Sequence, residues 1–466
     1  MKNMKKVLIA VLGLSMLIAG LAACSSGANE RDNDAGGNNQ SQATETTKLQ
    51  YWTGGRHDAD YIKSMIDKFN ETNTKNIEVE MTIMAENYAQ SLDLAFVSEQ
   101  APDVMALGDL VDLHNKGYVE PLDQFLTPEF KERFGENAFF EGANMLDGQI
   151  YTLPANGSTI RLIYNVDIFE KAGIAEPPKT LDEMVETAQK ITEVGKKDGI
   201  YGFALNYKSP TSALDRSSAA IAEINGTHGT GFDFKTGQYD FTGYKPIIEA
   251  FKQMKDDGST LPGSESLDID PLRAQFAEGN IGMYLSYSVE PGVYKNQFPA
   301  KIKWDAALPP SIDGTYSGVN NLGTGASRWL AMSSQSKNKE AAWEFMSFLY
   351  SDEVLKGYQE QGLGLSTVPS VAAFAEKPDI EGIDNFLPGK YDGRWPIHPQ
   401  GIKPEGKSYQ EEFVKYILVG GDLDGIVKSL NERYNAALEK EKATGKKMPE
   451  AIPDFDPAKL QGSLFK

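Results

Sequence analysis

Segments with the period of a β-strand and segments with the period of an α-helix alternate along most of this 466-residue chain. Ile62, Ile66 and Phe69 fall on one helical stripe, and residues 77–83 then alternate apolar and polar side chains. The predicted strands cover residues 48–52, 77–83, 104–107, 159–164, 201–205, 281–285 and 329–332. Because strand–helix alternation implies βαβ units, the sequence predicts an α/β fold with mostly parallel sheets.

Several helices have sequence signals at their ends. Thr180 and Glu183 have the spacing of a capping box. Asp270 is predicted to cap another helix, with Pro271 at its first position and Gly279 at its end. Asn338 is predicted to cap a third. The chain length suits two or three domains, and no internal repeat is present.

The N-terminus has the features of a secretory signal. Lys2, Lys5 and Lys6 precede an uncharged run over residues 7–23, which barely reaches the length of a membrane span. The alternative is a permanent transmembrane helix. Leu21-Ala22-Ala23-Cys24 resembles the bacterial lipobox and holds the only cysteine of the chain, which favours a lipoprotein signal peptide over residues 1–23.

The lipobox predicts a lipid-anchored protein on the extracytoplasmic face of the cell membrane. Cys24 becomes the lipidated N-terminus, and more than one acyl chain, such as palmitate, is needed for stable anchoring. Residues 24–47 hold no large apolar side chain, so they are predicted to form a flexible tether. The folded part is expected to begin near Lys48.

Composition and motifs exclude several functions. The formal net charge is −20, or −23 once the three lysines of the signal are removed, which argues against a nucleic-acid surface. One cysteine rules out an intramolecular disulfide and a cysteine-based zinc site, and four scattered histidines signal no metal site. No phosphate loop, dinucleotide fingerprint, zinc-protease motif or serine nucleophile elbow occurs. We therefore expect no cofactor and no metal.

A set of ordered segments resembles the family 1 extracellular solute-binding proteins of ABC importers, the group that includes maltose-binding protein. The segments are 101–104 (APDV), 117–122 (GYVEPL), 147–154 (DGQIYTLP), 162–169 (LIYNVDIF), 171–174 (KAGI), 177–183 (PPKTLDE), 276–279 (FAEG) with 282–283 (GM), and 336–345 (SKNKEAAWEF). Together they span most of the chain from residue 48 onward.

The resemblance implies a two-lobed periplasmic-binding-protein-like fold of type II, a monomer with discontinuous lobes around a hinge and a ligand cleft. Chain crossings are implied near 154–158, 322–326 and 363–368. The lobes are then 48–155 plus 325–364, and 156–324 plus 365–466. The implied function is not enzymatic: the protein binds a carbohydrate, most often an oligosaccharide in this family, and delivers it to the transmembrane permease subunits. Alternatives are a surface-anchored glycoside hydrolase or lyase, and a sensor subunit for a membrane kinase.

A sugar site needs aromatic rings for sugar faces and hydrogen-bonding side chains for hydroxyls. We looked for both after strand ends and at the crossings. The candidate ligand-binding residues are Trp52, Arg56, His57, Glu86, Asp109, Asn156, Ser158, Asn206, Tyr207, Tyr287, Glu290, Trp329, Arg394 and Trp395.

Several candidates have an ordinary structural alternative. Trp52 and Trp329 suit a core, and Asp109 suits the N-cap of the next helix. Glu86 is alternatively an exposed acid at a helix start, and the crossing residues Asn156 and Ser158 alternatively satisfy hinge backbone. Relatives often carry tryptophan where this chain has Tyr287, which leaves the stacking role there open. Trp395, in a long loop beside Arg394, is predicted to be exposed and to face the cleft.

Overall fold

The computed structural model describes residues 46–84, 87–134, 138–139, 144–324, 330–445 and 448–462. The chain from residue 45 onward makes one compact unit. The first strand begins at Thr47, one residue before the expected start of the folded part. The signal, Cys24 and nearly all of the predicted tether lie outside the described residues.

The first sheet has the strand order β15-β3-β1-β2. Its strands are β1 (Thr47–Thr53), β2 (Ile77–Ile83), β3 (Val104–Ala106) and β15 (Leu330–Met332). β1 pairs in parallel with β2 and β3, whereas β15 joins the edge of β3 antiparallel. We call this sheet and the helices packed on it the first lobe.

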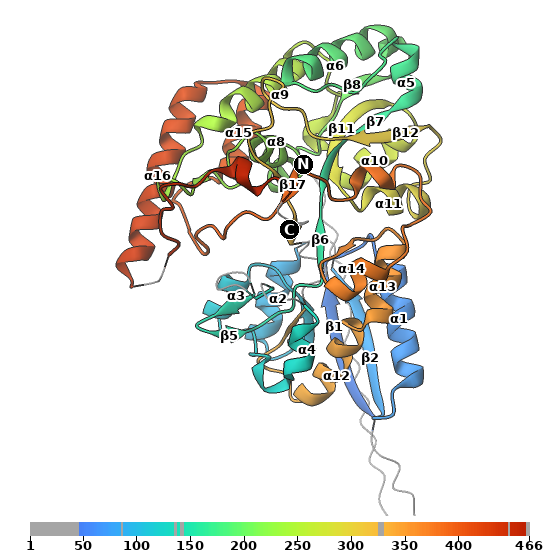
Figure 1. Ribbon diagram of the computed structural model, residues 1–466, viewed down its shortest axis with the longest axis vertical. Helices are drawn as coiled ribbons and strands as arrows, with labels where there is room; N and C mark the ends of the chain where they lie inside the picture. The colour runs from blue at the N-terminus through green and yellow to red at the C-terminus, as the bar shows by residue number, and fades with distance from the viewer. Residues whose placement is uncertain are drawn as a thin grey trace, which may run out of the picture. The chain divides into compact units, whose positions relative to one another are not determined.

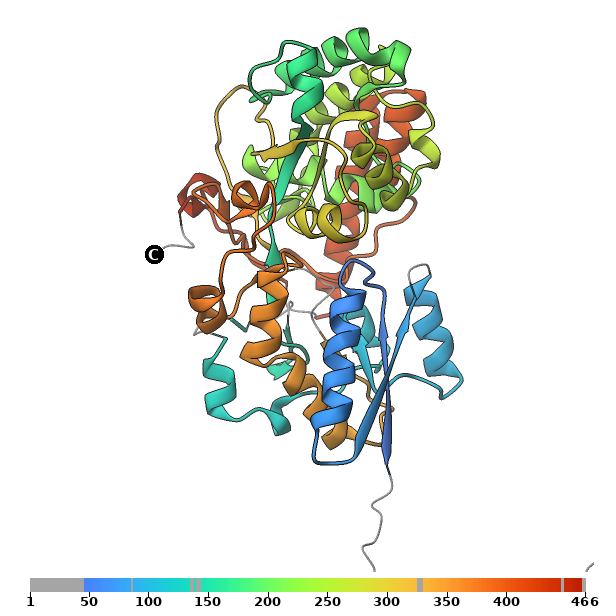
Figure 2. The same cartoon turned by 90° about the vertical axis from the view of Figure 1, so that its right-hand side faces the viewer.

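Most helices of the first lobe bury apolar side chains in its core. They are α1 (Ala59–Thr72), α2 (Tyr88–Val97), α3 (Leu110–Asn115), α4 (Pro128–Glu132), α12 (Lys339–Leu349), α13 (Asp352–Glu360) and α14 (Pro369–Phe374). α1 lies along β2 (Figure 2) and buries the predicted stripe of Ile62, Ile66 and Phe69. Phe345 of α12 contacts Phe69 of α1 and Tyr51 of β1, both edge-on. These contacts join the two helices and the sheet in one core.

The second sheet has the strand order β12-β7-β11-β8. Its strands are β7 (Ile160–Asn165), β8 (Tyr201–Phe203), β11 (Ile281–Tyr287) and β12 (Trp304–Ala307). Only β8 and β11 pair in parallel, and β7 is antiparallel to both of its neighbours. The prediction of a mostly parallel sheet is therefore wrong for this second lobe, because β7 comes in from a crossing segment rather than from a helix.

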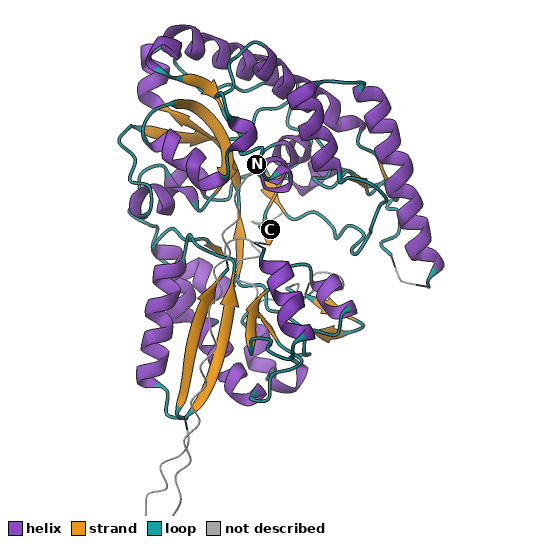
Figure 3. Ribbon diagram, turned by 180° about the vertical axis from the view of Figure 1, so that it is seen from behind, coloured by secondary structure: helices purple, strands orange, loops and turns teal. Residues whose placement is uncertain are grey.

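Helices surround the strands of the second lobe (Figure 3). They are α5 (Val166–Lys171), α6 (Leu181–Gly195), α7 (Pro210–Asp215), α8 (Ser218–Ile224), α9 (Lys245–Asp256), α10 (Ile269–Ala277), α11 (Glu290–Asn296), α15 (Tyr409–Val419) and α16 (Leu423–Ala443). The capping box at α6 is confirmed, since the Thr180 hydroxyl accepts from the Glu183 amide at 3.1 Å. The predicted cap of α10 is wrong: Asp268 caps it, because its carboxylate accepts from the Ile269 amide.

Three short strands form a sheet of their own, in the order β14-β6-β16. β6 (Asn156–Ser158) pairs antiparallel with β14 (Gly323–Thr324) and with β16 (Leu365–Ser366). β6 runs directly into β7 and is drawn between the two larger sheets in Figure 1. These strands coincide with the three predicted crossings, whose role as a hinge and whose lobe boundaries stay predictions.

Further two-residue strands complete the described chain. They are β4 (Met145–Leu146), β5 (Gln149–Ile150), β9 (Phe232–Asp233), β10 (Gln238–Tyr239), β13 (Asn320–Asn321) and β17 (Asp392–Gly393). β13, which precedes β14 in the chain, pairs in parallel with β17.

Candidate functional site

A buried ion pair lies where β11 ends and α11 begins. Glu290, the first residue of α11, is fully buried, and Arg273 of α10 donates to both of its carboxylate oxygens, at 2.9 Å from Nε and 2.7 Å from Nη2. Ser286 donates to the same carboxylate at 2.7 Å. Burial raises the pKa of Glu290, but its arginine and serine partners outweigh burial and hold the pKa below the ordinary value. The carboxylate therefore stays ionised.

Arg216, which follows α7, is the second arginine of this network. Its Nη1 donates to Ser286 Oγ at 2.8 Å, and its Nε and Nη2 donate to the carbonyl and hydroxyl of Ser212. Its guanidinium carbon lies 5.1 Å from the centre of the Tyr287 ring. Burial raises the pKa of the Tyr287 hydroxyl to about 12, so that hydroxyl remains a neutral donor and acceptor.

Two polar residues follow β8, which pairs with β11. Asn206 donates from Nδ2 to Ser212 Oγ at 3.0 Å, the same oxygen that Arg216 uses. Within the described chain, Asn206 Oδ1 and the Tyr207 hydroxyl are buried without a hydrogen-bond partner. Buried polar atoms are nearly always paired, so an unpaired oxygen on Asn206, whose amide nitrogen bonds Ser212, is typical of a site that a ligand completes.

The network extends to the first lobe through Asp270. Its carboxylate lies 3.1 Å from Arg273 and 3.1 Å from Arg56, in the loop after β1. Gln297 adds a hydrogen bond to the Arg56 carbonyl at 3.0 Å. The neighbouring His57 instead turns to the Tyr358 hydroxyl, at 3.0 Å. Polar contacts therefore run without a break from Asn206 in one lobe to Arg56 in the other.

We call the set of Arg56, Asn206, Tyr207, Ser212, Arg216, Asp270, Arg273, Ser286, Tyr287 and Glu290 the polar network. It contains five predicted site residues: Arg56, Asn206, Tyr207, Tyr287 and Glu290. The sequence analysis missed Ser212, Arg216, Asp270, Arg273 and Ser286. The sequence could have indicated Arg273, because it falls between Leu272 and Phe276 on the apolar face of α10. A charge that is buried there without a partner is costly, so a partner is expected.

Other predicted site residues lie away from the polar network. Trp52 is half-buried and packs against the first-lobe cluster under α2. Asp109 caps α3, with its carboxylate accepting from the Asp112 amide at 3.1 Å. Asn156 and Ser158 pair within the crossing sheet, Asn156 buried and Ser158 half-buried. The structure does not describe Glu86 or Trp329.

Trp395 is buried, so the expectation that it is exposed is wrong. Its indole N–H donates to the Val319 carbonyl at 2.8 Å, and its ring contacts Phe234 and Phe455. The C-terminal segment that carries Phe455 folds over the loop, which local sequence does not reveal. Arg394 beside it is exposed.

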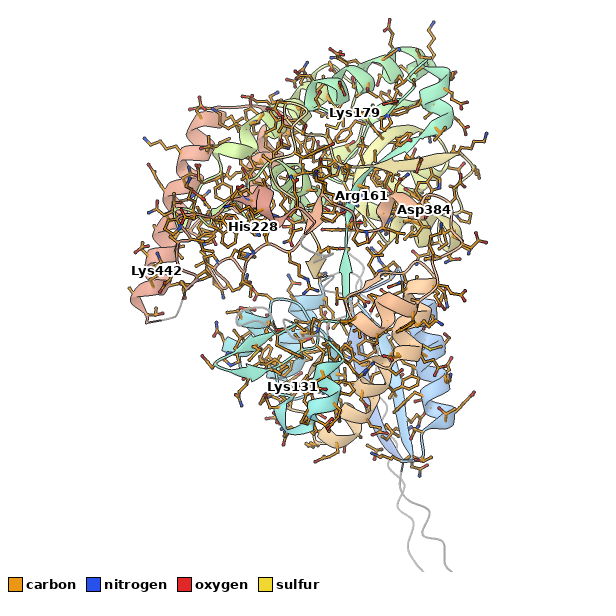
Figure 4. All side chains as sticks on the ribbon, viewed as in Figure 1. Lys131, Arg161, Lys179, His228, Asp384 and Lys442 are labelled. Carbon is orange, nitrogen blue, oxygen red and sulfur yellow. The ribbon has the colours of Figure 1, made fainter. Side chains whose placement is uncertain are left out.

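A second buried ion pair anchors that loop. Arg161 on β7 (Figure 4) donates from Nη1 and Nη2 to the two carboxylate oxygens of Asp392, at 2.9 and 2.7 Å. Both side chains are buried. Since a paired fork of this kind fixes geometry, it holds β17 against the second sheet and leaves no free charge for a ligand.

Among the described residues, no group of three or more histidines, cysteines or acids is arranged to hold a metal ion. Within the same residues, no helix combines the length and apolar character that a bilayer span requires.

Comparisons with known proteins show the family and the fold of the chain. The family model of the bacterial extracellular solute-binding proteins matches residues 55–356. A binding protein of Brucella abortus is 29% identical over 346 residues, which cover 71% of this chain and 78% of the relative. The maltotriose-binding protein of Pyrococcus abyssi is 28% identical over 333 residues, 66% of each chain.

The crystal structure of the GacH receptor of Streptomyces glaucescens, studied unliganded and with acarbose, superposes with a TM-score of 0.65 at 20% identity. The match covers 85% of this chain and 98% of the receptor. It confirms the two-lobed α/β fold that the sequence predicts.

Proposed function

Because the chain belongs to the bacterial extracellular solute-binding protein family, we propose that it is the extracytoplasmic receptor of an ABC importer for a carbohydrate, most simply an oligosaccharide. It binds the solute between its two lobes, returns it chemically unchanged and delivers it to the transmembrane permease subunits. A relative named for maltotriose, and a structural neighbour studied with acarbose, support a sugar.

The orphan polar atoms of Asn206 and Tyr207 carry this proposal. A sugar hydroxyl is both donor and acceptor, so it satisfies an amide oxygen and a phenol together. Tyr287 and Arg216 add an aromatic face and a fixed donor fork beside them. Ring stacking plus fixed hydrogen bonds is the combination that a carbohydrate requires.

Closure of the lobes around the solute is part of the proposal. The crossing sheet β14-β6-β16 is the hinge, since it consists of two- and three-residue strands that join the lobes. The ion pair of Arg56 with Asp270 lies across the lobes and stabilises the arrangement in which they touch. Trp52, His57, Asp109, Asn156, Ser158, Glu86, Trp329, Arg394 and Trp395 stay predicted ligand contacts.

Lipid attachment at Cys24 places the receptor at the cell membrane. The lipobox, followed by a segment without large apolar side chains, supports an acylated N-terminus on a flexible tether.

Isothermal titration calorimetry against a panel of neutral and acidic oligosaccharides tests the function. We expect one class to bind with a dissociation constant in the micromolar range or tighter, and chromatography of the recovered ligand to show it intact. Detection of cleavage products would instead favour the alternative function, a surface-anchored glycoside hydrolase or lyase. Absence of binding to every glycan would refute the proposal.

A further inference from the structure

One carboxylate lies between two arginines in the polar network. Arg273 occupies both oxygens of Glu290, at 2.9 and 2.7 Å. The nearest nitrogen of Arg216 is 3.9 Å from a Glu290 oxygen, too far for a hydrogen bond. The negative charge of Glu290 therefore pairs with Arg273 and only weakly with Arg216.

All hydrogen bonds that Arg216 donates to described residues go to neutral groups. Its described acceptors are the carbonyl and hydroxyl of Ser212 and the hydroxyl of Ser286. The side chain is 10% exposed. A buried cation is costly unless an anion compensates it closely, and the nearest carboxylate oxygen of Glu290 lies 3.9 Å from Arg216 and is bonded to Arg273. A guanidinium held in this way, with N–H groups left over, indicates a place for a further anion.

The neighbouring acids do not supply a counter-charge for Arg216. Asp270 lies 3.1 Å from both Arg56 and Arg273, so one charge serves two arginines. Asp215, adjacent to Arg216 in sequence, accepts from Gln410 and Tyr409 instead, and burial raises its pKa. Burial also raises the pKa of Glu223 to about 8, which leaves that group mostly protonated at neutral pH.

Asn206 supplies a second, independent observation. Its Nδ2 and the Nη2 of Arg216 both lie 3.0 Å from Ser212 Oγ, so amide and guanidinium are held side by side. Its Oδ1 is a buried acceptor without a described partner. An oxyanion beside a hydroxyl donor would satisfy both groups at once.

We propose that the solute carries an oxyanion, a carboxylate or a phosphate, beside free hydroxyl groups: the oxyanion binds Arg216 and a hydroxyl donates to Asn206. This inference rests on the proposed function and narrows its substrate class from a glycan to an anionic one.

Calorimetry with two matched pairs of probes tests the proposal. The first pair is digalacturonate and neutral galactobiose, and the second is glucose 6-phosphate and glucose. We expect the anionic member of at least one pair to bind at least about tenfold tighter than its neutral partner, and the pair that shows this identifies the oxyanion. Added sodium chloride should weaken binding of the anionic probe and leave binding of the neutral probe nearly unchanged.

Variants locate the effect. Arg216→Gln should abolish the preference for the anion, and Arg216→Lys should retain part of it because the charge remains. Lys428→Gln, which removes the same charge from an exposed site on α16, should bind like the unaltered protein. Circular dichroism establishes whether each variant is folded. If Arg216→Gln is unfolded, the Arg216→Lys variant and the salt dependence of binding to the unaltered protein test the proposal instead.

Equal binding within both pairs, or an unchanged preference in a folded Arg216→Gln variant, would overturn the proposal. A protein that binds a neutral oligosaccharide without favouring anions keeps the proposed function and loses this inference. A protein that binds neither probe pair nor any other glycan loses both.

Discussion

The guanidinium carbon of Arg216 lies 5.1 Å from the centre of the Tyr287 ring, close enough for a cation–π interaction. The contact holds an arginine in place beside an aromatic surface, and the two residues come from different elements, the end of α7 and the end of β11.

Replacement of Tyr287 tests that surface. Tyr287→Ala should weaken glycan binding by about tenfold or more, because it removes both the ring and the support of Arg216. Tyr287→Phe should stay within about threefold. Calorimetry measures both, with Tyr416→Ala as the control, since it removes a similar cation–π contact to Lys252 elsewhere in the lobe. Equal losses in Tyr287→Ala and the control would argue against a binding role.

Glu290→Gln should lower the free energy of unfolding by about 3 kcal/mol, because it leaves Arg273 buried without its counter-charge. Urea denaturation followed by circular dichroism measures the loss. Glu278→Gln is the matched control: its pair with Lys301 is exposed, and its loss should cost less than about 1 kcal/mol. Equal effects would mean that the buried pair contributes no more than a surface pair.

Trp395→Ala should destabilise the protein by about 3–5 kcal/mol, as expected for a large side chain removed from a core. The variant also leaves the Val319 carbonyl without its donor. Val419→Ala at an exposed position should change stability by less than about 0.5 kcal/mol. A Trp395→Ala variant that melts like the unaltered protein but binds glycan poorly would instead support the predicted ligand contact.

Glu223 should make stability depend on pH. Burial raises its pKa from 4.5 to about 8, so folding favours the protonated form. Its stabilising contribution is full below the unfolded pKa and is lost as the pH rises toward 8. Glu223→Gln is neutral throughout, so its stability relative to the unaltered protein should rise by about 1 kcal/mol per pH unit between those values. Urea titrations at several pH values measure this difference; a flat difference contradicts the burial argument.

Cys24→Ser should release the protein from the membrane, because no acyl chain is attached. Expression in a bacterial host, followed by separation of membrane and soluble fractions, measures the shift. Ser25→Ala leaves the cysteine in place and should remain membrane-bound. A Cys24→Ser protein that still sediments with membranes would favour a permanent transmembrane segment.

The local sequence was sufficient to predict all seven proposed strands and the capping box of α6, because hydrophobic period and cap residues are encoded within short segments. The two-lobed fold was implied by the family resemblance and is confirmed. It failed for the direction of β7, because antiparallel pairing with β11 and β12 depends on how the chain arrives from a crossing. Half of the polar network was found by looking after strand ends. Arg216 and Arg273 lie on or beside helices, and their approach to Glu290 depends on tertiary packing that no spacing rule records.

The placement of β15 at the open side of β3 has a consequence for biosynthesis. β1, β2 and β3 emerge from the ribosome early, whereas the strand that completes their sheet follows only after the whole second sheet has been made. Until then, β3 presents unsatisfied backbone groups that can recruit a strand from another copy. The first sheet therefore gains its last strand only when synthesis of the second sheet is over, so the N-terminal segment cannot complete that sheet by itself.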